Sequence, residues 1–493
     1  MSEISKSATR NVAVLTLTRI ITWTSTFLLM MFLPRYLGPV DYGRYYLGQS
    51  IVAMFALFIE FGGNYSITKA VSRARDEAGH IIVNAISIRG ILWLLSFIGV
   101  ITYALLVNYH SSVKIIIMIF GVGMLWSGAR SVIWSAFGGF EMLKYPSYGA
   151  IAETVFIASV GITAVVLGVG PIGFAVITIL GTLLNFIICL KFIRKMAPIL
   201  PKIDWKAARK SLKDSLPYFL NSVFGVIYYR IDTVMLSFMA PERVVGWYAA
   251  SYRFFETLMF VPSIFTIAIF PIMSRLWGED NKSLGRPLQK SLDFIFLSGV
   301  PLSVGAFAFS HQIIQFFYGI EAYQQSVMLL MIFGAGILLF YIDIMLGTIL
   351  LASDKHKQLT VNAFIAIFVN VALNYFLIPY TQTHFGNGGI GSAIATLVTE
   401  LFVMVAMLSI IQKDIFKDSN ISVQLKALFS GCLMALALWF MRSLDTPIIL
   451  QGCLSGVVYI AILFITRAIT SDDMALIGHL IPDRFRKIKE TQE

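Results

Sequence analysis

The sequence predicts an all-α polytopic membrane protein that contains a duplicated bundle of helices. Of its 493 residues, 57% are hydrophobic and only 13% are charged, and the mean hydropathy is +0.79. This balance excludes a soluble globular protein. Apolar runs of roughly 20 residues, long enough to cross a bilayer, recur along the whole chain, and part of the first half is repeated in the second.

About 14 segments are long and apolar enough to be transmembrane helices. The longest polar connector between them has about two dozen residues, so we expect no soluble domain. In chain order the expected spans are 11–33, 45–66, 82–107, 114–137, 149–168, 172–192, 216–239, 246–270, 289–309, 325–351, 359–380, 389–412, 423–441 and 447–467.

Two short similarities between the halves reveal the repeat. GVGPIGFAVITILGTL (168–183) returns as GNGGIGSAIATLVTEL (386–401), with seven of the sixteen positions identical. GPVDYGRYY (38–46) is echoed by APERVVGWYA (240–249), where a Pro-containing turn again precedes a Gly that opens a span. The similarities stand at corresponding places in two series of spans. They therefore predict two bundles that face each other across a central site, as in secondary transporters.

The basic residues predict the orientation in the membrane. With the amino terminus placed in the cytoplasm, 28 of the 38 Lys and Arg lie on the cytoplasmic side, five on the other side and five within spans. The positive-inside rule therefore predicts both termini in the cytoplasm. Because the net charge of +11 is distributed by loop and not gathered on one face, we expect no nucleic-acid partner.

The basic residues within spans are all arginines. A guanidinium binds phosphate oxygens through a planar fork and stays charged when buried, and a charge inside a membrane is costly enough to indicate function. We expect Arg19, Arg230 and Arg253 to line a substrate cavity. The other two candidates, Arg89 and Arg130, could instead snorkel to the inner interface or pair with acids.

Acidic residues within spans are candidates for partners of these arginines or for ion coupling. Arg253 and Glu256 are three residues apart, so they share a helix face with Tyr252 and can pair. Arg230 and Asp232 are two apart and should point to different sides of their helix. Buried carboxylates can also carry a coupling ion, and the candidates for that role are Asp232, Glu256, Glu400 and Glu60. Coupling to protons, to sodium ions or to the membrane potential all remain open.

Polar residues without charge add further cavity candidates. Asn362, Asn370 and Asn374 form a loose stripe along the eleventh span, and Tyr252 lies beside Arg253. The stripe could contact sugar hydroxyls, or it could join helices by hydrogen bonds. No pair of histidines has metal-ligand spacing and no arrangement suggests catalysis, so we expect no metal site, no catalytic residue and no cofactor beyond a possible coupling ion gradient.

Four segments resemble one family of transporters. The segments are TRNVAVLTLTRIITW (9–23), PRYLGPVDYGRYYL (34–47), YYRIDTVMLSFMAPERVVGWYAASYRFFE (228–256) and NVALNYFLIPYTQTHFGNGGIGSAIAT (370–396). They are similar to the corresponding segments of the polysaccharide flippases of the Wzx type. That family belongs to the superfamily that also contains the multidrug MATE exporters.

The resemblance implies a MATE-like core of two six-helix bundles with two added helices. The expected parts are an N-terminal bundle (1–200), a cytoplasmic basic linker (201–215), a C-terminal bundle (216–415), two additional transmembrane helices (416–470) and a cytoplasmic tail (471–493). It also implies export of a lipid-linked oligosaccharide across the cell inner membrane, for O-antigen, capsule or exopolysaccharide biosynthesis. The implied partners are that substrate, membrane lipids, and a polysaccharide polymerase with its chain-length regulator.

Three other functions can be compared with this interpretation. A membrane glycan polymerase or ligase typically carries a large external loop, whereas the longest external connector here (310–324) has about fifteen residues. A cation-coupled MATE multidrug exporter usually has an acid-dominated cavity, whereas this chain places five arginines in its spans. Acidic residues in the spans slightly outnumber these arginines, so the sign of the charge alone does not decide against a drug exporter. A lipid II flippase of the MurJ type shares the fourteen-span plan and a cationic cavity, but no MurJ motif is evident.

Overall fold

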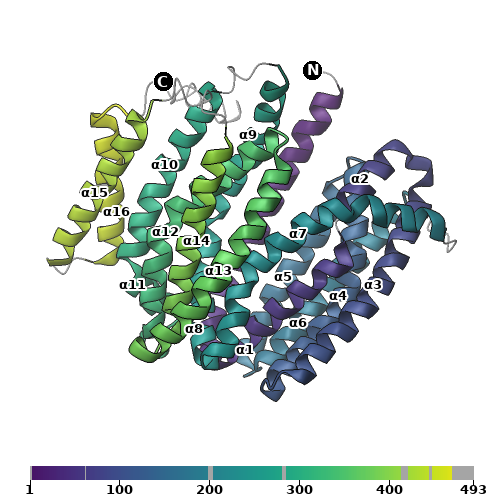
Figure 1. The fold of residues 1–493 in the computed structure, drawn as a ribbon, viewed down its shortest axis with the longest axis horizontal. Coiled ribbons are helices and arrows are strands. Elements are labelled where there is room, and N and C mark those ends of the chain that lie inside the picture. Colours follow the sequence, from purple (N-terminus) through teal and green to yellow (C-terminus); the bar gives the residue numbers. More distant parts are fainter. Residues whose placement is uncertain are drawn as a thin grey trace, which may run out of the picture. The chain divides into compact units, whose positions relative to one another are not determined.

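The computed structural model describes residues 3–61, 63–197, 204–279, 285–411, 420–443 and 447–468. Within these ranges the chain is helical almost throughout and contains no strand (Figure 1). Helices satisfy their backbone hydrogen bonds internally, which is why apolar segments of this length adopt them in lipid. The predicted all-α fold class is confirmed.

Where the structure describes them, the predicted spans consist mainly of helical residues. Eleven helices of the described chain are long and apolar enough to cross a membrane. The helices are α1 (Glu3–Glu60), α2 (Gly63–Arg73), the short 3-10 helix η1 (Arg75–Glu77), α3 (Ala78–Leu106), α4 (Ser111–Gly139), α5 (Lys144–Val166), α6 (Pro171–Ile193), α7 (Trp205–Met239), α8 (Glu242–Leu258), α9 (Phe260–Glu279), α10 (Gly285–Ala308), α11 (Ser310–Phe317), α12 (Ile320–Ala352), α13 (His356–Phe385), α14 (Gly388–Ile410), α15 (Ser422–Ser443) and α16 (Ile448–Ile465).

Several helix boundaries differ from the predicted spans. The first two spans are parts of one helix, α1, which is kinked at Gly38, where φ is 73°. The second predicted span is interrupted after Glu60, since Phe61 has a φ of 41° and α2 begins at Gly63. The eighth is divided between α8 and α9. The external connector 310–324 contains the helix α11. The interruptions after Glu60 and Leu258 fall inside apolar runs, so hydrophobicity alone does not reveal them.

The chain divides into two compact units, which are described separately. Unit 1 comprises residues 1–257, 314–329 and 360–399, and unit 2 comprises residues 258–313, 330–359 and 400–493. The two units interleave along the sequence. The domain boundaries expected from the sequence stay a prediction.

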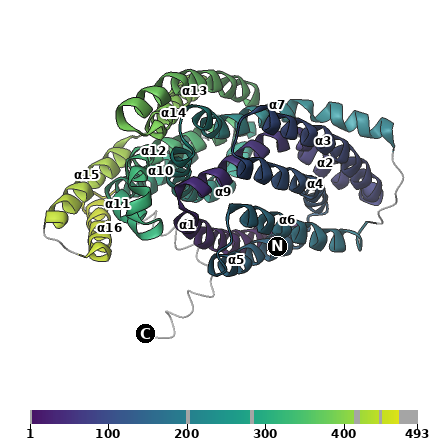
Figure 2. The ribbon, with the colours of Figure 1, turned by 90° about the horizontal axis from the view of Figure 1, so that it is seen from below.

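In unit 1 the helices of the first half pack around a shared core. Helices α5 and α6 lie side by side (Figure 2), and α1 packs against α3, α4, α5 and α7. A cluster of apolar side chains lies between α2, α3, α4 and α6, with Ile82, Val132, Phe137 and Ile193 completely buried.

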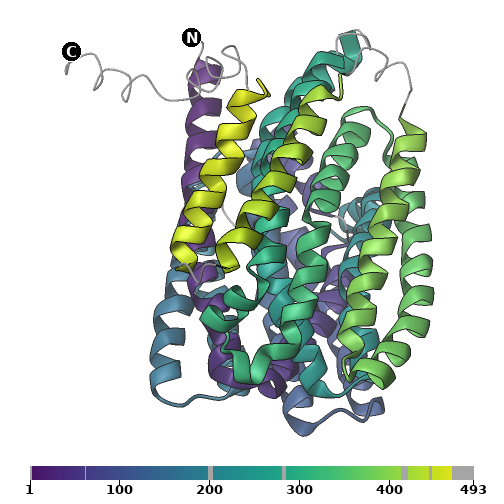
Figure 3. The ribbon, with the colours of Figure 1, turned by 90° about the vertical axis from the view of Figure 1, so that its left-hand side faces the viewer.

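In unit 2 the last two helices pack side by side (Figure 3) and α15 also packs on α10. Val300, Ala427, Leu438 and Tyr459 are buried together in this contact. The Tyr459 hydroxyl donates a hydrogen bond to the carbonyl oxygen of Leu297, at 3.1 Å. The two additional helices are therefore joined to α10 by both packing and a polar contact.

The repeated glycines have equivalent backbone conformations. Gly168 follows the end of α5 with a φ of 73°, and Gly386 follows the end of α13 with a φ of 66°. Both lie in the left-handed region, which glycine reaches without steric cost. The next helix, α6 or α14, begins two or three residues later in each case. The similarity of 168–183 and 386–401 is thus a repeat in structure as well as in sequence.

The other pair of repeated glycines forms a direct contact between the two halves of the chain. A Cβ on Gly43 of α1 would lie 2.5 Å from the carbonyl oxygen of Glu242 and 2.8 Å from the amide nitrogen of Gly246. A Cβ on Gly246 of α8 would overlap the carbonyl oxygen of Pro39. We call this the glycine contact. Beside it, Arg44 Nε donates to Glu242 Oε2 at 2.8 Å.

Candidate functional site

Two of the predicted cavity arginines meet at one carboxylate inside unit 1. Arg253 Nη1 donates to Glu256 Oε2 at 3.1 Å, and Arg230 Nη2 lies 3.7 Å from Glu256 Oε1. Arg230 Nη1 also donates to the Tyr46 hydroxyl at 2.9 Å, with its guanidinium 5.7 Å from the centre of that ring. We call Tyr46, Arg230, Arg253 and Glu256 the arginine cluster; its members come from α1, α7 and α8.

The surroundings of the arginine cluster are aromatic and largely buried. Tyr42, Tyr46 and Tyr252 are each at most 4% exposed. The charged side chains themselves retain some exposure, at 22% for Arg230, 24% for Arg253 and 28% for Glu256. Two guanidiniums that share one carboxylate leave a formal charge of +1 in this cluster. Such an arrangement attracts an anion with several oxygens.

A second cluster surrounds the buried carboxylate of Asp232, on the opposite side of α7. Asn374 Nδ2 donates to Asp232 Oδ1 at 2.7 Å. Thr396 Oγ1 and the Tyr248 hydroxyl donate to Asp232 Oδ2 at 2.7 and 3.1 Å. We call these residues the Asp232 cluster. Arg230 and Asp232 thus point to different sides of α7, as their spacing predicts.

The repeat places a simpler version of the Asp232 cluster in the first half. Tyr45 corresponds to Tyr248, and Thr178 corresponds to Thr396. The Tyr45 and Thr178 hydroxyls form a direct hydrogen bond of 3.0 Å. No acidic residue lies in the first span (11–33), which corresponds to the span that carries Asp232. The carboxylate therefore distinguishes the second half from the first.

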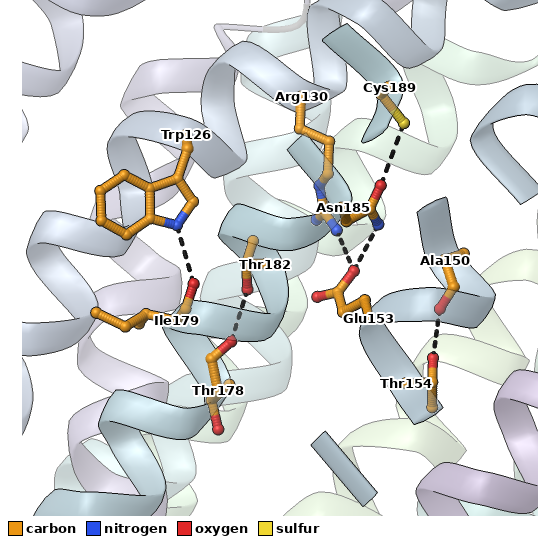
Figure 4. Close-up of polar contacts among 10 residues, drawn as sticks. All are labelled: Trp126, Arg130, Ala150, Glu153, Thr154, Thr178, Ile179, Thr182, Asn185 and Cys189. Atoms are coloured by element: carbon orange, nitrogen blue, oxygen red, sulfur yellow. Dashed lines mark hydrogen bonds and ion pairs between the residues drawn. The ribbon is translucent and has the colours of Figure 1, made fainter. Parts of the chain in front are cut away.

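A third cluster engages Arg130 within the first half (Figure 4). Arg130 Nη1 donates to Glu153 Oε2 at 2.7 Å, and Asn185 Nδ2 donates to the same oxygen at 2.6 Å. Cys189 Sγ lies 3.2 Å from Asn185 Oδ1. These contacts join α4, α5 and α6. Of the two alternatives for Arg130, pairing with an acid is the one that occurs.

Arg89 is held by polar groups other than acids. It is 4% exposed, and its guanidinium donates to the carbonyl oxygen of Gly128 at 2.8 Å, to Asn64 Oδ1 at 2.7 Å and to Ser131 Oγ. This side chain does not snorkel outward. It links α3 to α2 and α4.

The remaining candidates are scattered. Arg19 lies on α1, but its side chain lies outside the described residues. Glu60 is exposed at the last residue of α1. Asn362 is buried on α13, as is Asn370, which accepts a hydrogen bond from Asn374 at 2.9 Å. Glu400, 4% exposed, lies in unit 2, where it interacts with the buried Asp343.

Sequence reasoning singled out Asn374 but missed the hydroxyl partners in these clusters. Tyr46, Tyr248 and Thr396 contact the charged residues directly, yet hydroxyl groups are common in membrane helices and do not stand out by residue type. The internal repeat was the one feature of the sequence that could have identified Tyr248 and Thr396, because both occupy repeated positions.

A repeated set of membrane helices with buried charge in its interior defines a secondary transporter. Within this class the chain belongs to the polysaccharide biosynthesis protein family, whose model matches residues 8–277. The model of the lipid II flippase MurJ also matches, over residues 146–456. The expectation that MurJ motifs are missing was therefore wrong. The resemblance to the polysaccharide flippases is confirmed.

Named relatives and solved structures agree with this assignment. The chain is 22% identical over 376 residues to the probable low-salt glycan biosynthesis flippase Agl15 of Haloferax volcanii, covering 76% of this chain and 77% of the relative. It is 23% identical over 417 residues to a putative O-antigen transporter of Escherichia coli K12, covering 83% and 97%.

Two solved structures share the fold. The lipid II flippase MurJ in an inward closed conformation superposes with a TM-score of 0.76 at 16% identity, covering 94% of this chain and 99% of that one. An inward-facing MATE family transporter of the MOP superfamily gives a TM-score of 0.67 at 15% identity, covering 81% and 96%. These structures support the MATE-like fold of the chain.

Proposed function

We propose that this protein is a flippase that moves a polyprenyl-pyrophosphate-linked oligosaccharide from the inner to the outer leaflet of the cell inner membrane, with both its termini in the cytoplasm. Its product supplies O-antigen, capsule or exopolysaccharide biosynthesis, where a polysaccharide polymerase and its chain-length regulator act next. The protein moves its substrate without changing a covalent bond, as transporters of this family do, and is not an enzyme.

The observation that carries this proposal is the arginine cluster. The diphosphate of the substrate carries roughly two negative charges and several oxygens. Paired guanidiniums bind such a group better than other side chains do, because each presents a fork of N–H donors to the phosphate oxygens. Arg230 and Arg253 supply those guanidiniums from neighbouring helices, and Tyr46 holds one of them. The polyprenyl tail stays in lipid, so only the head group needs a polar path.

The transport cycle alternates access through separation of the two halves of unit 1. On the proposed topology the glycine contact and the Arg44–Glu242 ion pair lie at the outer end of the helices. Backbone atoms that touch at Gly43 and Gly246 leave no passage between these two helices there. We propose that this contact closes the outer end while the head group binds from the inside and that it opens for release.

Asp232 is our proposed site for the coupling cation. Its carboxylate receives hydrogen bonds from neutral groups, and its place two residues from Arg230 puts it on a different side of α7. Among the described residues no arginine is paired with this carboxylate. A buried carboxylate of this kind can bind a proton, or a sodium ion through the oxygens of Asn374 and Thr396. Proton and sodium coupling differ in the gradient that drives transport, which the experiment below varies.

Transport by the purified protein in vesicles tests the proposal. The substrates are a polyprenyl-pyrophosphate oligosaccharide, lipid II and a cationic dye, each with a proton gradient, a sodium gradient or none. We expect movement of the oligosaccharide lipid, stimulated by one gradient. Movement of the dye alone would instead identify a drug exporter, and movement of lipid II alone would identify a peptidoglycan flippase.

A further inference from the structure

Glu256 occupies the position that a phosphate group would take between the two arginines. One of its oxygens lies toward Arg230, and the other accepts a hydrogen bond from Arg253. A carboxylate and a phosphate use the same fork of guanidinium N–H groups. The carboxylate of Glu256 therefore occupies the proposed anion-binding site.

The charged groups around Glu256 determine how a diphosphate can bind at this site. The neighbouring groups that face Glu256 are Arg230 of α7, Arg253 of α8, and the tyrosines Tyr46 of α1 and Tyr252 of α8. With Glu256 in place, a head group of roughly two negative charges would make the site negative overall and would meet a like charge at contact distance, where repulsion is strong. The head group and Glu256 therefore compete for the guanidiniums.

Asp232, the other acidic residue near Arg230, does not pair with the two arginines. Asp232 lies only two residues along α7, but its two oxygens accept hydrogen bonds from Asn374, Thr396 and Tyr248. It is 4% exposed. The carboxylate that pairs with Arg230 and Arg253 is that of Glu256.

We propose that Glu256 is a built-in competitor of the diphosphate head group. It holds Arg230 and Arg253 together in the empty protein, yields them to the substrate, and returns to them at the outer leaflet. Because its return lowers the net charge of the two arginines from +2 to +1, it lowers the cost of releasing a multiply charged anion. This inference rests on the proposed function and explains how a site that binds phosphate can also let it go.

The test compares binding and transport in the same variants. Inorganic pyrophosphate is the binding probe, measured by calorimetry on the purified full-length protein, and flipping of the lipid-linked oligosaccharide is measured in vesicles. Glu256→Gln removes the competing charge and keeps the shape of the side chain. We expect it to bind pyrophosphate at least tenfold more tightly and to flip the oligosaccharide more slowly, because release becomes limiting.

Two further variants make the result interpretable. Glu256→Asp keeps the negative charge but shortens the side chain by one methylene, which moves the carboxylate away from the two arginines. Its affinity for pyrophosphate should therefore fall between those of the wild type and Glu256→Gln. This order gives a test even if the Gln variant yields little folded protein. Glu321→Gln removes the same charge from an exposed position at the start of α12, and it should leave both pyrophosphate affinity and flipping as in the wild type.

Each outcome distinguishes this inference from the proposed function. Unchanged or weaker pyrophosphate binding by Glu256→Gln and Glu256→Asp would overturn the competitor role, while wild-type flipping would leave the proposed function intact. Equal strengthening by Glu321→Gln would also overturn it, because the effect would then be one of net charge. A wild-type protein that neither binds pyrophosphate nor moves the oligosaccharide would reject the proposed function itself.

Discussion

Buried charges in this protein are satisfied in two distinct ways. Arg130 has a carboxylate and a neighbouring amide that complete its contacts within one half of the chain. Arg230 and Arg253 instead share a single carboxylate. The first arrangement is complete and serves packing, whereas the second leaves a surplus positive charge for a ligand.

The Arg130–Glu153 pair should stabilise the folded protein. Glu153→Ala would leave a cation that is 23% exposed without its partner, a change that costs about 3–5 kcal/mol when a pair is fully buried and less here. We expect a clear fall in melting temperature in detergent. The control is Glu141→Ala, which breaks the 3.8 Å contact of the exposed Arg75 and Glu141; exposed pairs contribute about 0–1 kcal/mol. Equal melting temperatures for the two variants would contradict this role.

Asp232 should govern coupling and not substrate binding. Asp232→Asn removes the charge that binds the cation but keeps a side chain able to bond to Thr396. We expect the variant to lose the stimulation of flipping by an ion gradient while still binding pyrophosphate within about threefold of the wild type. Stimulation that persists in Asp232→Asn would show that the cation binds elsewhere.

For single residues, the sequence predicts contacts within a helix but not contacts between distant helices. The pairing of Arg253 with Glu256 follows from helical spacing alone, and so does the separation of Arg230 from Asp232. The contacts of Asp232 with Asn374 and Thr396 join residues more than 140 positions apart. Which helices are neighbours is decided by packing, and helical periodicity does not encode it.

At the scale of helices, the decisive feature is the close approach of α1 and α8 at the glycine contact. Gly246→Ala should push these helices apart, because a Cβ there overlaps the carbonyl oxygen of Pro39. We expect slower flipping and several-fold faster labelling of a Val245→Cys probe by a membrane-impermeant maleimide added outside, since Val245 is 1% exposed.

Gly225→Ala is the control for this experiment. Gly225 lies on α7, and a Cβ at that position meets no atom within 4 Å. Flipping and probe labelling in this variant should equal those of the unmodified background. Labelling that stays slow in Gly246→Ala would mean that the glycine contact does not close the outer end.

Helix positions were predictable from hydrophobicity, but breaks inside apolar runs were not. The described residues of the predicted spans are mainly helical, because apolar length is a strong signal. The kink at Gly38 lies in the Pro-containing turn that the sequence indicates between the first two spans. The interruptions after Glu60 and Leu258, in contrast, occur inside apolar runs. In such runs a change of backbone direction leaves no mark in composition.

For the whole molecule, the duplication explains both the fold and its functional asymmetry. The repeated glycines at 168 and 386 share one conformation, yet only the second half carries the Asp232 carboxylate. We expect both termini to be cytoplasmic, as the distribution of Lys and Arg predicts. Fusion of a reporter that is active only in the cytoplasm should give signal at either terminus. An active fusion at just one terminus would contradict an even number of spans.

The most direct measurement is flipping of a polyprenyl-pyrophosphate oligosaccharide by the wild type and by Arg230→Gln/Arg253→Gln in vesicles with equal amounts of inserted protein. The account predicts that the wild type transports, that the double variant loses at least about 99% of the rate, and that it no longer binds pyrophosphate, since two charge-assisted contacts of about 1.5–3 kcal/mol each disappear. Transport by the double variant at the wild-type rate would contradict the claim that these two arginines carry the head group.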